Sequence, residues 1–421
     1  MFDRSLLNPI LSGKDLYDAL LFLPDYDESV RSYDASTRLV ALSELYNIYL
    51  PSAMSEEIYS KLYLSLLRSL NKKGTLNSIK QLNENFKCIK NNPYKEVLGV
   101  MGGSDSFTII GSSGIGKSSA ISRAVSLITD KSFVEVEGTK ICPFVVVQCP
   151  FDSSVKGLAL EILRKIDAVL ETKYYANAIR SHATTDVLIG IISQAALNHI
   201  GLLIIDEIQN VANSKNGKTF INSLTQLINN SGISICMVGT PESTVFFKKE
   251  LQLARRSVGL YYSPLQFDEY FAYFCRIAFS YQYTRKKSEI NAGITEWLYE
   301  HSGGLVSLVI SLIHDAQEIA ILNGTETLDL NTLNEAYDKR TAMLHGFIND
   351  GARILPQTGK LKRKNEQAVL EKSNSVTVNQ WQGLSISEIV LQAKKSRYDV
   401  VDVLKEYITI EEIGKEGCKL C

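Results

Sequence analysis

The sequence predicts an α/β fold with a parallel five-stranded sheet, preceded along the chain by an N-terminal helical region and followed by a C-terminal helical lid. Three observations lead to this prediction: short apolar runs between residues 107 and 262, stretches of helical periodicity between those runs, and a glycine-rich loop that directly follows the first run. Nearly continuous apolar runs are typical of strands buried on both faces, and the intervening helices complete right-handed crossovers. The expected strands are 107–110, 144–148, 202–205, 233–238 and 260–262.

The glycine-rich loop matches the pattern G-x-x-x-x-G-K-[ST] and precedes an expected helix at 119–128. Its glycines let backbone N–H groups turn toward phosphate oxygens, and the helix start adds partial positive charge. Lys117 is expected to reach the β- and γ-phosphates of a bound nucleotide, and the Ser118 hydroxyl to ligate Mg²⁺. The predicted nucleotide-binding residues are Gly111, Ser112, Ser113, Gly114, Ile115, Gly116, Lys117, Ser118 and Ser119.

Two acidic residues end the apolar run at 202–205. We expect Asp206 to hold Mg²⁺ and Glu207 to polarise the attacking water, because phosphoryl transfer to water needs a positioned nucleophile. Thr240 follows the run at 233–238 and is expected to contact the γ-phosphate or the water, since that strand should lie between the other two.

A cationic pair, Arg255 and Arg256, follows a predicted helix just before the last strand. Either arginine could stabilise transition-state charge in the site of a neighbouring subunit. Such a site would be complete only in an oligomer.

Together these residues resemble the TnsC/TniB group of AAA+ ATPases, which regulate transposons with heteromeric transposases. The resemblance spans about residues 36–310 and includes segments outside the phosphate loop. These segments are Thr37-Arg38-Leu39, Tyr49-Leu50-Pro51, Cys149-Pro150-Phe151-Asp152-Ser153-Ser154-Val155-Lys156-Gly157-Leu158, Ile166-Asp167, Thr172-Lys173-Tyr174, Gly201 to Gln209, Gly239-Thr240-Pro241 and Ala254-Arg255-Arg256.

The resemblance implies an AAA+ P-loop NTPase that uses ATP and Mg²⁺ and assembles as rings or filaments around double-stranded DNA. Members of the group link a target selector of the TniQ or TnsD type to a transposase of the TnsB type, and a TnsA-type endonuclease is a further candidate partner. ATP binding would favour assembly and hydrolysis would permit disassembly. Target choice by a DNA-binding selector and target choice by an RNA-guided, CRISPR-associated complex are both compatible with the resemblance.

The resemblance also implies that loops after the second strand face DNA, which points to Lys156, Thr172 and Lys173. Such contacts would be sequence-tolerant and salt-sensitive. One departure concerns the helical lid, where Leu305, Val306 and Ser307 occupy positions at which many AAA+ proteins carry an arginine.

Three alternatives remain open at this stage. They are a replication initiator or helicase-loader type of AAA+ protein, a P-loop kinase for a small molecule, and a nucleotide-binding scaffold without useful hydrolysis. The glutamate at 207 argues against the kinase, because that residue type suits activation of water.

Composition and charge narrow the class of protein further. Hydrophobic residues make up 45% and charged residues 22%, which excludes a wholly disordered chain. The net charge of −1 excludes a polycation. The seven cysteines are odd in number and partly lie in apolar runs, so we expect reduced thiols in a cytoplasmic protein. The resemblance implies that this cytoplasm is bacterial. We expect no signal peptide, and no membrane span because no apolar run approaches 18 residues.

Four regions are expected along the 421 residues. They are an N-terminal helical region at 1–80, the nucleotide-binding domain at 81–265, a helical lid at 266–348, and a basic linker with a partner-binding tail at 349–421.

Overall fold

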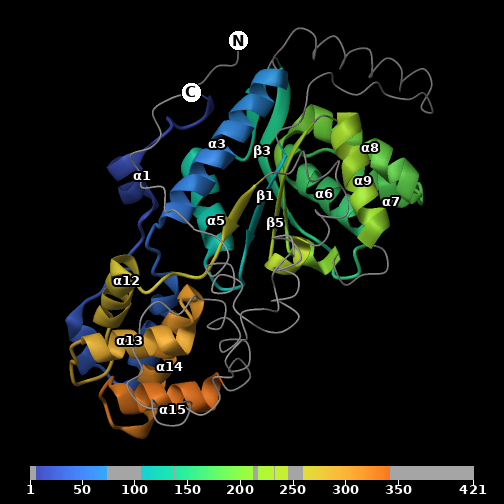
Figure 1. Cartoon of the computed structure of the whole chain (residues 1–421). Helices are drawn as coiled ribbons and strands as arrows, with labels where there is room; N and C mark the ends of the chain where they lie inside the picture. Colours follow the sequence, from blue (N-terminus) through green and yellow to red (C-terminus); the bar gives the residue numbers. More distant parts are fainter. Residues whose placement is uncertain are drawn as a thin grey trace, which may run out of the picture. The chain divides into compact units, whose positions relative to one another are not determined.

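The computed structural model describes residues 6–73, 106–136, 138–211, 217–231, 233–244 and 259–341 (Figure 1). The chain forms two compact units, Met1–Leu355 and Pro356–Cys421. All described residues belong to the first unit. The expectations for the tail, including its basic stretch, therefore lie outside the described residues.

A six-stranded sheet forms the centre of the nucleotide-binding region, with the order β2-β3-β4-β5-β1-β6. Its strands are β1 (Phe107–Gly111), β2 (Val134–Val136), β3 (Thr139–Gln148), β4 (Ile200–Asp206), β5 (Ser234–Gly239) and β6 (Leu260–Tyr262). The five expected strands are all present and run parallel to one another. The expected number of strands was wrong, because β2 pairs antiparallel with β3 at one edge. In β2 the exposed Glu135 separates two buried valines, so the sequence shows no continuous apolar run there.

Successive side chains along the strands alternate between two apolar cores, so both faces of the sheet are buried. In β4, Leu203 and Ile205 belong to one apolar core, whereas Leu202 and Ile204 belong to another. The first core contains α6 (Val155–Leu170), α8 (Thr185–His199) and α9 (Gly217–Ser231). The second contains α1 (Gly13–Leu20), α3 (Ala53–Lys73) and α5 (Lys117–Ile128). Burial on both faces explains why these strands are continuously apolar.

Strand β5 lies between β1 and β4, as expected from the sequence. In parallel strands the carboxyl ends meet at one edge of the sheet, where ligands of α/β proteins commonly bind. Three loops therefore converge there: the one after β1 with its glycines, the one after β4 with its acidic pair, and the one after β5 with Thr240.

A third apolar core joins the lid to part of the N-terminal region. The lid helices are α12 (Glu269–Ser280), α13 (Ala292–Ser302), α14 (Val306–Asn323) and α15 (Leu330–Arg340). Side-chain oxygens of Asp268, Asn291 and Asp329 cap the first, second and fourth of these helices. Helix α2 (Ala35–Leu42) and the 3-10 helix η3 (Ser43–Asn47) pack against α14.

The remaining short elements are α7 (Tyr174–Arg180) and the 3-10 helices η2 (Glu28–Ser32), η4 (Ile208–Val211) and η5 (Pro241–Ser243). Of these, η4 and η5 directly follow β4 and β5 and contact each other.

Helix α14 corrects the expectation that no apolar segment approaches membrane-spanning length. It has 18 residues and a mean hydropathy of 1.3, so its length and composition would suffice. More than half of it, 56%, is buried inside the protein, against α2, η3, α12, α13 and α15. An apolar helix buried in this way is explained as a core helix of the lid.

Candidate nucleotide-binding site

A cavity of about 420 Å³ lies at the carboxyl edge of the sheet. Three sets of residues line it: the phosphate loop, the strand ends of β4 and β5, and a wall from the N-terminal region and the lid. From the first two sets the lining residues are Ser113, Gly114, Ile115, Gly116, Lys117, Ser118, Ser119, Asp206, Glu207, Gln209, Gly239 and Thr240. The structure thus brings together most of the residues that the sequence singled out.

The phosphate loop takes a backbone shape that needs glycine at two positions. Gly114 and Gly116 have φ values of +82° and +94°, in the left-handed region. A Cβ on Gly114 would lie 2.3 Å from Oγ of Ser307 in the lid. No side chain caps the N-terminus of α5, so its first N–H groups remain available for phosphate oxygens.

Lys117 is buried, and its ammonium group faces the loop itself. It donates hydrogen bonds to the carbonyl oxygens of Gly111 (2.7 Å) and Ser112 (2.9 Å). Burial lowers the pKa of Lys117, and the charges of Asp206 and Glu207 oppose that shift. Gly111 and Ser112 were predicted to bind the nucleotide. Their carbonyl groups contact Lys117, and neither residue lines the cavity.

Ser118 and Asp206 form the candidate metal site. The Ser118 hydroxyl donates to Oδ2 of Asp206 at 3.1 Å, although the two residues are 88 positions apart. Oδ1 of Asp206 accepts the backbone N–H of Glu207 at 2.8 Å. Hydroxyl and carboxylate oxygens are the hard ligands that Mg²⁺ prefers, so the donor set fits this ion.

Two further polar side chains, those of Glu207 and Thr240, follow the ends of β4 and β5 and line the cavity. Glu207 is exposed to the cavity and has a φ of +59°, unusual for a residue with a side chain. The Thr240 hydroxyl oxygen is buried and makes no hydrogen bond within the described protein. A buried hydroxyl without a partner costs stability, which is typical of a group kept for a ligand.

The apolar end of the cavity was not predicted from the sequence. The N-terminal region contributes Tyr46, Ile48, Tyr49, Leu50, Ser52, Met54 and Ser55, and the lid side contributes Tyr262, Ser263, Leu265, Tyr270, Phe274, Val306, Ser307, Ile310 and Ser311. Tyr270 donates a hydrogen bond to the Leu50 carbonyl at 3.0 Å, which joins the two sides. These residues follow no common spacing, so only the tertiary structure identifies them.

The lid reaches the phosphate loop through its backbone. The N–H of Ser307 donates to the Gly114 carbonyl at 3.0 Å, and Leu305 packs against the lid core. Of the three lid positions that lack the common arginine, Val306 and Ser307 line the cavity. At these two positions the lid therefore presents an apolar side chain and a hydroxyl to the cavity, and no cation.

The candidate DNA contacts lie on the helices that follow β3. Lys156 is exposed in the first turn of α6, whose N-terminus Ser154 caps by accepting from Gly157 N–H at 3.0 Å. Lys173 is exposed directly before α7. Thr172 donates its hydroxyl to Asp167 at 2.6 Å, so that group already has a partner inside the protein. Arg255 and Arg256 lie outside the described residues.

Four cysteines, Cys142, Cys149, Cys236 and Cys275, are buried and free, in line with the expectation of reduced thiols. Burial raises the pKa of each, to about 11 for Cys142 and about 12 for Cys149 and Cys275. Protonated, buried thiols of this kind are poor nucleophiles.

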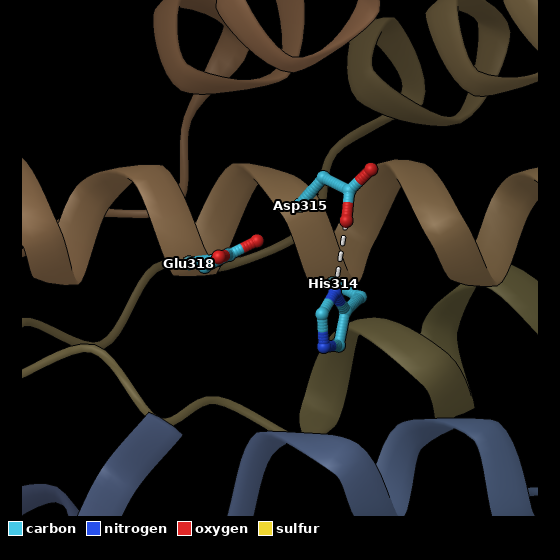
Figure 2. A group of neighbouring side chains, drawn as sticks. All are labelled: His314, Asp315 and Glu318. Atoms are coloured by element: carbon cyan, nitrogen blue, oxygen red, sulfur yellow. Dashed lines mark hydrogen bonds and ion pairs between the residues drawn. The ribbon is translucent and has the colours of Figure 1, made fainter. Parts of the chain in front are cut away.

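A second polar cluster lies on α14 and consists of His314, Asp315 and Glu318 (Figure 2). Their ligand atoms lie within 4.8 Å of one another, close enough to surround a metal ion. Protein contacts already account for them: His314 Nδ1 is 2.9 Å from Asp315 Oδ1, and Glu318 is 3.4 Å from Arg340. His314 also packs on the Tyr46 ring, with centroids 4.8 Å apart.

The strand order, the phosphate loop after β1, the acidic pair after β4 and the lid against the loop define the class of protein. The chain is an α/β P-loop NTPase of the AAA+ type. Residues 101–263 match the family "TniB: Bacterial TniB protein", which confirms the resemblance to the TnsC/TniB group. No curated protein matches the sequence.

Several solved structures are distantly similar to this chain. One is the Aeropyrum pernix ORC2 protein in its ADP form, with 15% identity, coverage of 62% of this chain and 67% of that one, and a TM-score of 0.40. Another is the Aeropyrum pernix ORC1 protein in complex with DNA, with 13% identity, 81% coverage of both chains and a TM-score of 0.39. A structure on katanin self-assembly shows 14% identity, coverage of 75% and 92%, and a TM-score of 0.34. None is close enough to bear on function.

Proposed function

We propose that this protein is an ATP-dependent regulator of DNA transposition that assembles on double-stranded DNA. In this role it bridges a target selector of the TniQ or TnsD type to a TnsB-type transposase, with a TnsA-type endonuclease as a further partner, in the bacterial cytoplasm. The observation that carries the proposal is the TniB family match, because residues 101–263 include the phosphate loop, the acidic pair and Thr240.

The described residues account for ATP hydrolysis in the following way. The phosphate loop and Lys117 bind the β- and γ-phosphates, and the apolar end of the cavity takes the base and sugar. Ser118 and Asp206 hold Mg²⁺, which when bound offsets the charge of the phosphate oxygens. Glu207 accepts a proton from the attacking water, and the Thr240 hydroxyl donates to the water or the γ-phosphate.

Assembly would follow from the same site. Among the described residues lining the cavity, Lys117 is the one cation, and the lid contributes none. We propose that Arg255 or Arg256 of an adjoining copy completes the charge compensation, so nucleotide state controls whether copies stack. In a ring or filament, the contacts that the exposed Lys156 and Lys173 of each copy make with DNA would add up to a sequence-tolerant affinity for the DNA backbone.

Electron microscopy of the full chain with duplex DNA and a non-hydrolysable ATP analogue tests the proposal. Rings or filaments that enclose the duplex are expected with the analogue and not with ADP. A chain that stays monomeric with ATP and DNA would contradict it. Glu207→Gln separates a switch from an inert scaffold: this variant should keep ATP affinity, lose hydrolysis by at least about 100-fold and form longer-lived assemblies.

A further inference from the structure

Gln209, in the short helix η4 after β4, links the two groups proposed to handle the attacking water. Its Oε1 accepts the backbone N–H of Thr240 at 3.2 Å. Its Nε2 donates to Oε2 of Glu207. The side chain therefore bridges the ends of β4 and β5, and it lines the same cavity as both partners.

The orientation of this amide follows from the chemistry of its neighbours. A backbone N–H can only donate, so the oxygen of the Gln209 side chain must face Thr240. The amide nitrogen then faces Glu207, whose carboxylate accepts. Both ends of the side chain are satisfied in one arrangement, and the flipped arrangement would place donor against donor at Thr240.

Gly239 leaves room for the bridge. Its φ is not in the left-handed region, so its backbone conformation does not require glycine. The limited space around it does require glycine, because a Cβ at this position would lie 2.9 Å from Oε1 of Gln209 and 2.6 Å from Cγ2 of Ile208. The absence of a side chain at Gly239 therefore leaves the space that the Gln209 amide occupies beside Thr240.

The turn that carries Gln209 is itself fixed to the neighbouring strand end. Asn210 donates from Nδ2 to the carbonyl of Cys149 at 3.0 Å, and its own carbonyl accepts the Ser153 hydroxyl at 3.1 Å. The N–H of Asn210 donates to the Glu207 carbonyl at 3.0 Å. Anchoring of this kind restricts where the Gln209 amide can lie.

We propose that Gln209 is a positioning residue that holds the Glu207 carboxylate against the tip of β5, where the attacking water must lie. The inference rests on the proposed hydrolysis of ATP and names a residue that neither the sequence motifs nor the family match assign. Glu207 follows the strand and is exposed, and the Gln209 amide donates a hydrogen bond to its carboxylate. Such a hydrogen bond restricts the orientations of the carboxylate to those near the reactive geometry. Gln209 itself need not touch the substrate.

Steady-state ATPase kinetics with a direct binding measurement for a fluorescent ATP analogue test this role. Gln209→Ala and Gln209→Met should both lower kcat by about 10- to 100-fold, with KM and analogue affinity within about twofold of wild type. Methionine fills nearly the same space but makes neither hydrogen bond, so rescue by Gln209→Met would show a packing role and overturn the proposal. Gly239→Ala, which pushes on the amide from the other strand, should reproduce the loss in kcat.

Gln148→Ala is the matched control, because Gln148 is an exposed glutamine at the end of β3 and does not line the cavity. Its kcat should equal that of wild type. An unchanged kcat in Gln209→Ala would overturn the positioning role while leaving the proposed function intact. A wild-type chain that binds ATP but does not hydrolyse it would instead refute the hydrolysis on which both depend. Circular dichroism confirms that each variant is folded.

Discussion

The guanidinium of Arg38 forms two hydrogen bonds with the carboxylate of Glu326, at 2.6 and 2.7 Å, across 288 positions of the chain. Arg38 is only 1% exposed and also donates to the carbonyls of Tyr33 and Tyr283. The pair ties the N-terminal region to the lid. Because both of these regions line the apolar end of the cavity, this ion pair indirectly fixes the shape of the proposed base-binding site.

Breaking this pair should destabilise the protein. Arg38→Met leaves a carboxylate partly buried without its partner, and we expect the free energy of unfolding to fall by about 3 kcal/mol in urea titrations. Lys339→Met is the control, because its pair with Glu335 is exposed and should contribute less than about 0.5 kcal/mol. Equal effects of the two variants would contradict a special role for Arg38.

Acid should weaken the same contact. The hydrogen bond from Arg38 lowers the pKa of Glu326, so its contribution is fully present above the ordinary carboxyl range and is lost as pH falls below it. Thermal unfolding below about pH 4.5 should therefore narrow the difference between wild type and Glu326→Gln.

Thr240 offers a test in which stability and activity change in opposite directions. Thr240→Val removes a buried hydroxyl that has no partner within the described protein, so the free energy of unfolding should stay level or rise by up to about 1 kcal/mol. ATP hydrolysis should nevertheless fall by about 10-fold or more, since the hydroxyl is proposed to contact the water or the γ-phosphate. Thr240→Ser keeps the hydroxyl and should retain most of the activity; equal loss in both variants would point to packing.

Replacing the exposed lysines that follow β3 should change how DNA affinity depends on salt concentration. Lys156→Ala and Lys173→Ala should each weaken binding to duplex DNA regardless of sequence and reduce the slope of log K against log salt by about 0.9 per site. Fluorescence anisotropy at several salt concentrations measures this slope. Lys165→Ala, on a later turn of α6, is an exposed control on the same helix. A slope that changes as much in the control would place the DNA elsewhere.

Because the ammonium group of Lys73 is buried, we expect the free energy of unfolding to depend on pH above about pH 7. Its ammonium donates to the carbonyls of Ala196 and Leu197 near the end of α8, and burial lowers its pKa to about 7. Between pH 7 and the ordinary lysine range the unfolded chain binds more protons than the folded one, so stability should rise with pH. Urea titrations at pH 7 and pH 9 should show this rise in wild type and a smaller one in Lys73→Met.

The sequence by itself identified the residues that are proposed for the phosphate end of the site. The glycine pattern, Lys117 and Ser118, the acidic pair after an apolar run and Thr240 all lie within short segments whose spacing reports local structure. The parallel strands were predictable for the same reason, since burial on both faces leaves a continuous apolar run.

Only the tertiary structure decided which distant segments share the cavity. The wall formed by Tyr46, Leu50, Tyr270 and Ile310, the ion pair of Arg38 with Glu326 and the bridge through Gln209 join residues without a common spacing. Such contacts arise when separate elements bury their apolar faces against one another, and a local pattern in the sequence carries no record of which face meets which.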